Sequence, residues 1–443
     1  MDWKHLLSIT RYGQEDRKQD ENKSVRSEFQ RDYDRLIFSS PFRRMQNKTQ
    51  VFPLPGSVFV HNRLTHSLEV ASIGRSLGNM VSEQLLQQPA FSNIHELHEI
   101  GTIVATACLA HDMGNPPFGH SGEKAISSFF VKEEGNQIIE DFKLTPQQKN
   151  DLTRFEGNAN ALRLLTHQFK GRRFGGFSLT YTTLAGLIKY PFPSMNNLNQ
   201  KKYGYFQTEQ HAFEDIANRL KLKRLSKGHY ARHPLVHLVE AADDISYLIM
   251  DLEDAQKLNI IDTPRAKELL LDFHSAKEKQ RIDGVMKEVS DVNEQISYLR
   301  AITINKLAQA AADVFLHHHD AILEGTFEGS LTDRLEDHLQ KPMKTLRDVG
   351  FGEIYKHRKV VEIELAGFNI LETLVREFTR AINHHDSKYY ENLLKLVPEQ
   401  FRTTDEDPYE RLRSVIDFIS GMTDLYALEI YRSIKGIEMP SLR

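Results

Sequence analysis

An apolar stretch that ends on two metal-binding residue types constrains this chain more than any other feature. Residues 99–110 (EIGTIVATACLA) predict a buried helix whose last turn carries His111 and Asp112. Gly114 and the Asn-Pro-Pro after it predict a forced stop. A carboxylate buried at a helix C-terminus is unfavourable, because the helix dipole is negative there and desolvation is costly. A bound cation removes both objections, so the segment predicts one wall of a metal site.

Two other helical patterns offer partners for this wall. Residues 61–77 place Arg63 and His66 on the same inward face as a run of apolar side chains. Residues 233–255 place Asp243, Tyr247 and Asp251 at i, i+4 and i+8, which makes a polar stripe beside an apolar one. Taken alone, His66 is better explained as a hydrogen-bonded core histidine. The acidic stripe, taken alone, is explained equally well as a solvent-facing side of the helix.

Taken together, these segments predict a metal site with two imidazoles and two carboxylates. Such a ligand set suits a divalent transition metal, and it leaves coordination positions open for water and substrate. A set of mixed nitrogen and oxygen ligands does not identify one metal firmly. We expect Mn²⁺ or Mg²⁺. The expected ligands are His66, His111, Asp112 and Asp243.

Composition favours a mainly helical, soluble protein. Only 15 prolines and 24 glycines occur in 443 residues, so long helices are possible, and the net charge of −4 argues against a generally basic nucleic-acid binder. Cys108 is the only cysteine, which excludes an intrachain disulfide and a cysteine-based zinc site. We see no secretory signal or membrane span, and we expect a cytoplasmic protein. We expect an all-α fold, with a loop or short hairpin at 51–60 and a short strand within 351–366.

Several long motifs, in the same order, resemble the deoxyguanosine triphosphate triphosphohydrolase family within the HD phosphohydrolase superfamily. The similarity runs from about residue 25 to 256, and more weakly through 362–371. The motifs are FRRMQNKTQVFP (42–53), NRLTHSLEV (62–70), AHDMGNPPFGHSGE (110–123), RFEGNANALRLL (154–165) and EAADDISYLIMDLEDA (240–255). This resemblance implies hydrolysis of a deoxynucleoside triphosphate to deoxynucleoside and inorganic triphosphate, by water attack on the α-phosphorus.

The resemblance also implies roles for individual residues. His120 and Glu123 resemble the family's catalytic pair; they lie three residues apart on one helix face, so Glu123 can orient His120. The alternative for Glu123 is a first-turn acid favoured by the helix dipole. Asn115 stands where some relatives have a further histidine, and we assign it no catalytic role. The remaining residues are expected to bind substrate: Gln50 and Asp251 the sugar 3′-hydroxyl, Tyr247 the sugar face where a 2′-hydroxyl would clash, and Arg63, Lys189 and Lys202 the phosphates.

We divide the chain into a loosely held polar arm (1–30), an HD catalytic core (31–260) and a helical C-terminal region packed on that core (261–443). The resemblance implies a homo-oligomer, with a hexamer favoured. The basic segment 221–233 (KLKRLSKGHYARH) is explained either by a solvated loop or by contact with phosphates, including single-stranded DNA. Two other functions stay open: another HD reaction, such as that of a 5′-nucleotidase or cyclic-nucleotide phosphodiesterase, and a regulatory nucleotide- or DNA-binding protein.

Overall fold

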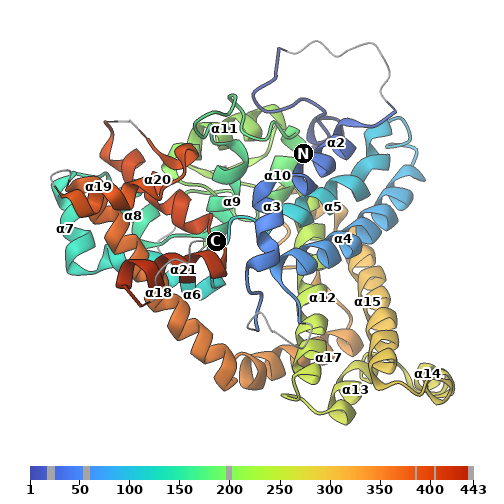
Figure 1. Ribbon diagram of the computed structural model, residues 1–443. Coiled ribbons are helices and arrows are strands. Elements are labelled where there is room, and N and C mark those ends of the chain that lie inside the picture. The colour runs from blue at the N-terminus through green and yellow to red at the C-terminus, as the bar shows by residue number, and fades with distance from the viewer. Residues whose placement is uncertain (17–24, 53–59, 196–201, 385–386, 404–405, 438–443) are drawn as a thin grey trace.

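A computed structural model describes residues 1–16, 25–52, 60–195, 202–384, 387–403 and 406–437 of the chain (Figure 1). Its elements are helices, together with one two-stranded antiparallel sheet formed by β1 (Arg224–Ser226) and β2 (His229–Tyr230) within the described residues. The prediction of a mainly helical fold with at most a small sheet is therefore confirmed. None of the helices in the described ranges has the length and apolar character needed to cross a bilayer.

The helices follow one another along the chain with short connections; η marks the 3-10 helices and, for η5, a π-helix. The first half of the chain holds α1 (Trp3–Leu6), α2 (Glu28–Ile37), α3 (Ser40–Arg44), η1 (Met45–Asn47), α4 (Arg63–Leu86), η2 (His95–Glu99), α5 (Ile100–Ala110), α6 (Gly119–Val131), α7 (Glu133–Asp141), α8 (Pro146–Thr153), α9 (Gly157–Thr166), α10 (Tyr181–Leu187), η3 (Gln207–Glu209), α11 (Gln210–Arg219) and α12 (Pro234–Lys257). The second half holds α13 (Thr263–Leu271), α14 (Ala276–Glu288), α15 (Val292–His317), α16 (His319–Glu324), η4 (Thr332–Arg334), α17 (Asp337–Val349), η5 (Gly350–Ile354), α18 (Arg358–Asn383), α19 (Lys388–Lys395), η6 (Glu399–Phe401), α20 (Pro408–Ser420) and α21 (Asp424–Lys435).

Helix α5 is the centre of the larger hydrophobic core. Every residue of α5 except Thr102 is buried, which explains why its sequence is apolar all round. Helices α2, α4, α10 and α12 pack around it. Helices α4 and α5 approach closely at two glycines, because a β-carbon on Gly78 would lie 2.7 Å from the α-carbon of Gly101. This tight crossing brings the N-terminal turn of α4 to the C-terminal end of α5.

A second hydrophobic core lies on the other side of the molecule and contains residues of α6, α18, α20 and α21. In Figure 1 the 26-residue helix α18 runs diagonally from the side of α17 towards this group. Helix α18 packs on α6, and α15 packs on α4 and α12. The C-terminal helices thus contact both cores, whereas the boundary at residue 260 stays a prediction.

The expected strand within 351–366 is wrong. This segment contains η5 and the first two turns of α18. Residues 361–365 alternate between apolar and charged side chains, but they belong to a helix. Val360 is buried, and the residues after it line the exposed side of α18. On this side Arg358 pairs with Glu362, one turn further along. The sheet forms instead in the basic segment 221–233. The hairpin or loop expected at 51–60 falls largely on residues 53–59, outside the described residues.

The first residues of the chain pack against the rest of the molecule, while the boundary expected at residue 30 stays a prediction. Trp3 and Leu6 are buried, and the Trp3 indole Nε1 donates to Nε2 of His319 at 2.9 Å. Arg11 is also buried and forms ion pairs with Glu28 (2.5 Å) and Asp32 (2.6 Å) of α2. Residues 1–12 therefore belong to the packed structure, and the polar composition of residues 13–30 hid this anchoring.

Candidate active site

The predicted metal ligands come together where α4, α5 and α12 meet. His66 of α4, and His111 and Asp112 directly after α5, offer ligand atoms that all lie within 4.8 Å of one another. Asp243 of α12 joins them, with its Oδ1 3.1 Å from Nε2 of His66 and 3.5 Å from Nε2 of His111. Two imidazoles and two carboxylates thus converge from three helices. This donor set fits a divalent cation.

Local interactions fix these ligands. Asn62 caps α4 in a reciprocal capping box with Thr65, which starts the helix one turn before His66. The ring Nδ1 of His111 lies 2.6 Å from the carbonyl oxygen of Cys108. A proton on Nδ1 would be donated to that carbonyl, which leaves the Nε2 lone pair directed at the carboxylates, the usual orientation of a metal-binding histidine.

The turn after α5 differs in detail from the prediction. The helix ends at Ala110, and Gly114 is not in the left-handed region that a glycine cap would require. Glycine is required at position 114 because of close packing, since a β-carbon there would lie 2.2 Å from the amide nitrogen of Ala161 in α9. The turn is pressed against α9, and this contact holds Asp112 in place.

The charges of the site favour ionised carboxylates. Burial opposes the charge of Asp243, but His111 and His66 hold the pKa of this carboxyl well below its usual range. The neighbouring Asp244 points elsewhere and accepts a hydrogen bond from the Thr332 hydroxyl at 2.7 Å. Burial raises the pKa of Asp244 to about 6. The geometry therefore favours Asp243, the first of the two aspartates, as the one that faces the histidines.

Asp112 is held by two side chains besides the histidines. Arg63 Nη1 donates to its Oδ2 at 2.6 Å, and the Asn115 amide donates to its Oδ1. The Nε of Arg63 is buried without a hydrogen-bond partner. Arg63, expected to bind phosphate, is thus engaged with a predicted metal ligand, and Asn115, which sequence reasoning left without a role, contacts the same carboxylate. In the sequence, this contact was indicated by the spacing of three residues between Asp112 and Asn115, which lie on either side of the turn.

His120 and Glu123 form the expected pair at the start of α6. Nδ1 of His120 lies 2.7 Å from Oε2 of Glu123, and the His120 side chain is 74% exposed whereas that of Glu123 is 10% exposed. The backbone N–H of Gly157 donates to the other carboxylate oxygen at 2.8 Å. Burial opposes the charge of Glu123, but the hydrogen bond from His120 and the charge of Lys202 hold the pKa of its carboxyl below its usual value. The carboxylate can therefore stabilise a protonated imidazole.

The two lysines expected at the phosphates are both paired with acids. Nζ of Lys202 lies 3.0 Å from Glu156 and 3.8 Å from Glu123. Nζ of Lys189 lies 3.0 Å from Glu240, one helical turn before Asp243. Although burial opposes its charge, Glu240 raises the pKa of Lys189.

The three residues expected to bind the sugar differ in burial and in hydrogen bonding. Oε1 of Gln50 is buried and has no hydrogen-bond partner. Asp251 is buried and accepts a hydrogen bond from the hydroxyl of Tyr355, and burial raises the pKa of its carboxyl to about 7. Tyr247 is half-buried one turn after Asp243. Sequence reasoning missed Tyr355, because this residue lies 104 positions from Asp251 in the segment expected to be a strand.

The basic segment 221–233 is partly engaged within the chain. Arg232 Nη1 lies 3.0 Å from Glu240, and Lys223 donates to the carbonyl of Glu324 at 2.8 Å. The strand β1 within the segment is exposed. Contact between this segment and a nucleic acid stays a prediction.

Comparisons with known proteins relate this chain to a family of hydrolases. The HD domain family model matches residues 63–172, and the phosphohydrolase-associated domain model matches residues 334–433. A deoxyguanosinetriphosphate triphosphohydrolase-like protein of Synechocystis is 38% identical over 99% of this chain and 100% of its own length. A protein with the same description from Pseudomonas aeruginosa is 36% identical over 100% of both chains. The deoxyguanosinetriphosphate triphosphohydrolase of Yersinia enterocolitica is 30% identical over 99% of both chains.

This chain belongs to the deoxyguanosinetriphosphate triphosphohydrolase family. The resemblance seen in the sequence motifs is thereby confirmed, and the chain is a hydrolase of the HD superfamily, whose members depend on metal ions. Three of the four predicted metal ligands lie inside the matched HD region. Asp243 lies beyond it and is brought in by α12.

Proposed function

We propose that this protein hydrolyses deoxynucleoside triphosphates, dGTP foremost, to deoxynucleoside and inorganic triphosphate. In this reaction water attacks the α-phosphorus and the bond to the 5′-oxygen of the sugar breaks. The observation that carries the proposal is the joint placement of a four-residue metal-ligating group and the paired His120 and Glu123 in a member of this family. The names of the curated relatives supply the substrate class.

His66, His111, Asp112 and Asp243 would hold a divalent cation, which we expect to be Mn²⁺ or Mg²⁺. Such a cation supplies Lewis-acid polarisation of a phosphoryl oxygen and lowers the pKa of water. The donor set supports this assignment, because Asp112 and Asp243 are held ionised and the hydrogen bond at Nδ1 of His111 leaves its Nε2 available.

Proton transfer is assigned to His120. Glu123 holds Nδ1 of the ring, so Nε2 is the nitrogen that faces outward to exchange a proton with the reacting groups. Since Glu123 is itself held by the Gly157 amide, the pair keeps one orientation. The deoxynucleoside leaves as an alkoxide that needs a proton, and a protonated His120 can supply it.

Substrate binding is assigned to six residues around this centre. Lys189 and Lys202 would bind the phosphates by exchanging their carboxylate partners for phosphate oxygens, and Arg63 would do so while remaining close to Asp112. Tyr247 would pack on the sugar and leave no room for a 2′-hydroxyl. Gln50 and Asp251 would bind the 3′-hydroxyl, and the unpartnered Oε1 of Gln50 is consistent with a missing ligand donor.

The deciding experiment is anion-exchange analysis of products after incubation with each of the four dNTPs, and with GTP, in Mn²⁺ or Mg²⁺. We expect triphosphate and deoxynucleoside from dGTP and neither from GTP. Monophosphate and pyrophosphate as products would contradict the proposed bond cleavage. Absence of product from single nucleotides and from a mixture of all four dNTPs would contradict the triphosphohydrolase reaction and favour either a binding protein or an HD enzyme that acts on monophosphates or cyclic nucleotides.

Two controls connect the reaction to the site. Asp112→Ala should abolish both Mn²⁺ binding, measured by calorimetry, and turnover, because the variant removes a ligand and the partner of Arg63. Tyr247→Ala should allow GTP to be hydrolysed, since the steric exclusion is gone. Retention of activity by the Asp112 variant would refute the assignment of the metal site.

We further propose that the chain forms a homo-oligomer, with a hexamer favoured, and that the segment 221–233 binds single-stranded DNA. Light scattering of the purified protein tests the first proposal. DNA binding that weakens steeply with added salt, and that is lost when the exposed Arg224 and Lys227 become alanine, supports the second.

A further inference from the structure

Asp424 is a buried carboxylate whose two oxygens serve two segments far away in the sequence. Its side chain belongs to the first residue of α21 and is 5% exposed. Oδ2 accepts a hydrogen bond from the backbone N–H of Thr49 at 2.8 Å, and Oδ1 accepts one from the backbone N–H of Phe118 at 3.0 Å. One carboxylate thus ties together two segments separated by about seventy residues.

Both segments lead directly into the candidate active site. Thr49 precedes Gln50, which is assigned to the sugar. Phe118 precedes Gly119 and His120, and it adopts the left-handed conformation, with φ of 59°. A bulky residue pays conformational energy for that φ, so an external contact is needed to keep it there. The hydrogen bond from the Phe118 amide to Asp424 is such a contact, and it sets where α6 begins.

Asp424 is not explained as a cap of its own helix. The N-cap of α21 is Thr423, whose hydroxyl oxygen accepts from the Tyr426 amide at 3.2 Å. Both oxygens of Asp424 are directed at other segments instead. A first-turn acid of a helix needs no such partners, since the helix dipole alone favours it.

The neighbouring end of α20 reinforces the same connection. Nζ of Lys48, which is 3% exposed, donates to the carbonyl oxygens of Asn115 (2.6 Å) and Ser420 (2.9 Å). Asn160 donates from its side chain to the carbonyl of Gly114 at 2.8 Å and lies 3.3 Å from the Ser420 hydroxyl. The turn that carries the predicted ligand Asp112 towards His120 is therefore held from the α20–α21 junction at several points.

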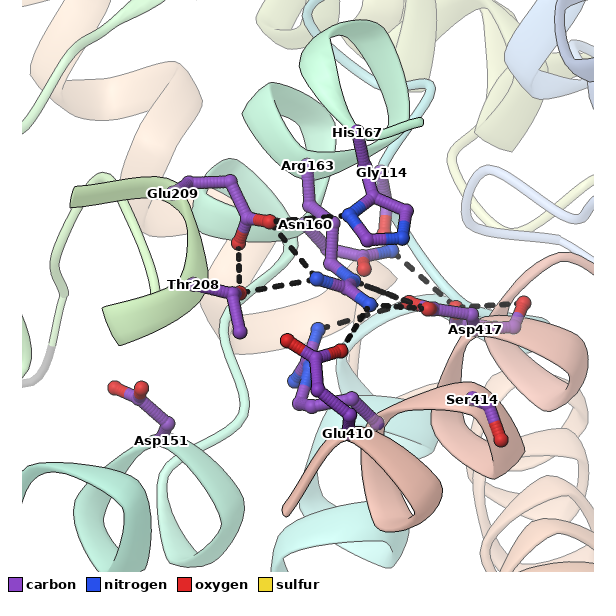
Figure 2. Close-up of polar contacts among 12 residues, drawn as sticks. Gly114, Asp151, Asn160, Arg163, His167, Thr208, Glu209, Glu410, Ser414 and Asp417 are labelled. Carbon is purple, nitrogen blue, oxygen red and sulfur yellow. Dashed lines mark hydrogen bonds and ion pairs between the residues drawn. The ribbon is translucent and has the colours of Figure 1, made fainter. Parts of the chain in front are cut away.

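Helix α20 is itself firmly attached. Figure 2 shows the Arg163 guanidinium of α9 between Glu209 and Asp417, and the distances to these carboxylates are 2.8 Å each. Arg163 and Asp417 are buried. The junction that presents Asp424 thus rests on a buried ion-pair network rather than on a free helix end.

We propose that Asp424 is a positioning residue of the active site, which sets the spacing between the Gln50 segment and the start of the helix that carries His120 and Glu123. The inference rests on the proposed function for its kinetic consequence. It gives the phosphohydrolase-associated region, residues 334–433, a direct part in assembling the site. Asp424 acts through the amides of Thr49 and Phe118 rather than by touching substrate or a metal ligand.

The test compares three variants of the full chain. Asp424→Ala removes both acceptors, whereas Asp424→Asn keeps one carbonyl oxygen and places a donor opposite the other amide. Thr423→Ala is the matched control, because it weakens the same helix end without touching either segment. We expect kcat/KM for dGTP to fall about 10- to 100-fold in Asp424→Ala, since a displacement of about 1 Å at a site has effects of that size. Asp424→Asn should lose less, and Thr423→Ala should stay within about twofold of wild type.

Amide hydrogen exchange provides a readout that does not depend on turnover. Peptides covering residues 45–50 and 115–122 should exchange faster in Asp424→Ala, while peptides of α5 should be unchanged. Equal effects of Thr423→Ala and Asp424→Ala, or unchanged exchange in both segments, would overturn the proposal. If the wild type hydrolyses no nucleotide, the proposed function fails, and the exchange comparison still decides the role of Asp424. Should Asp424→Ala not fold, the same comparison is made with Asp424→Asn.

Discussion

The carboxyl of Asp251 should cost the protein stability, and replacing it with asparagine should recover part of that cost. Burial raises the pKa of Asp251 to about 7, in spite of the hydrogen bond from Tyr355 that favours the charged form. The folded state therefore holds a proton that the unfolded chain releases at lower pH. With a raised pKa in the folded state, this group lowers stability as pH rises from about 4 to about 7, and the loss is complete above that range.

The magnitude follows from the two pKa values. A difference of about three pH units corresponds to a ceiling of about 4 kcal/mol at pH 8. Asparagine has the same shape, retains an oxygen for the Tyr355 hydroxyl and is neutral at every pH. We expect the free energy of unfolding of Asp251→Asn to be about 2 kcal/mol higher than that of the wild type at pH 8. This is less than the ceiling, because relaxation and water penetration reduce the cost of burying a charge. The gain in stability should vanish near pH 4. The same substitution should also weaken hydrolysis of dGTP, because binding sites commonly retain groups that destabilise the fold.

The assay is thermal and denaturant unfolding between pH 4.5 and 8, in the presence of a chelator so that no bound cation alters the field at residue 251. Asp254→Asn is the matched control on the same helix. Asp254 is also buried, but its two oxygens lie 2.8 Å from the amide and the Nδ1 of His61. The free energy of unfolding of Asp254→Asn should fall by about 1.5–3 kcal/mol, the usual contribution of a hydrogen bond to a charged group. A gain for Asp251→Asn that does not change with pH, or no gain at pH 8, would refute the reasoning.

Four other substitutions test the site. Glu123→Gln removes the negative partner of His120 and should lower kcat for dGTP about 10- to 100-fold with little change in KM, as measured in steady-state kinetics; an unchanged kcat would exclude the pair from proton transfer. Gly157→Ala places a β-carbon 2.3 Å from the Asn115 side-chain oxygen and 2.8 Å from a Glu123 oxygen and should likewise lower kcat, whereas normal kinetics would show that both side chains can move away without loss. Asp243→Asn should weaken Mn²⁺ binding at least tenfold by calorimetry while Asp244→Asn leaves it unchanged, and the reverse order would exchange the two assignments.

Local signals predicted most of the helices and the contact between His120 and Glu123. The helical pattern of residues 61–77 lies on α4 (Arg63–Leu86), because Asn62 and Thr65 supply the cap that defines the start of this helix. His120 and Glu123 lie three residues apart, so one helical turn was enough to predict their contact. Such features depend on residues that are close in sequence, and they can be recognised before the fold is known.

Interactions between distant segments could not be predicted in this way. The contact of Asp424 with Thr49 spans 375 positions, and nothing in either segment signals the other. The π-helical turn η5 and the hydrogen bond from Tyr355 to Asp251 were missed because a short alternating pattern looked like a strand. The apolar pattern predicts a helix whose last turn carries His111 and Asp112, whereas α9 contacts the turn and α5 ends at Ala110.

The pairing of Arg163 with Asp417 has a consequence for how this chain can be dissected. Arg163 lies within the matched HD region and Asp417 within the matched associated region, so a fragment containing only one region loses this ion pair, and Arg163 retains a counter-ion only where the fragment includes Glu209. Removing one partner of a buried ion pair costs up to about 3–5 kcal/mol where no second counter-ion remains, a large share of the stability of an ordinary domain. An HD fragment expressed alone would therefore be a poor mimic of the enzyme, and recombination between relatives should exchange both regions as one unit.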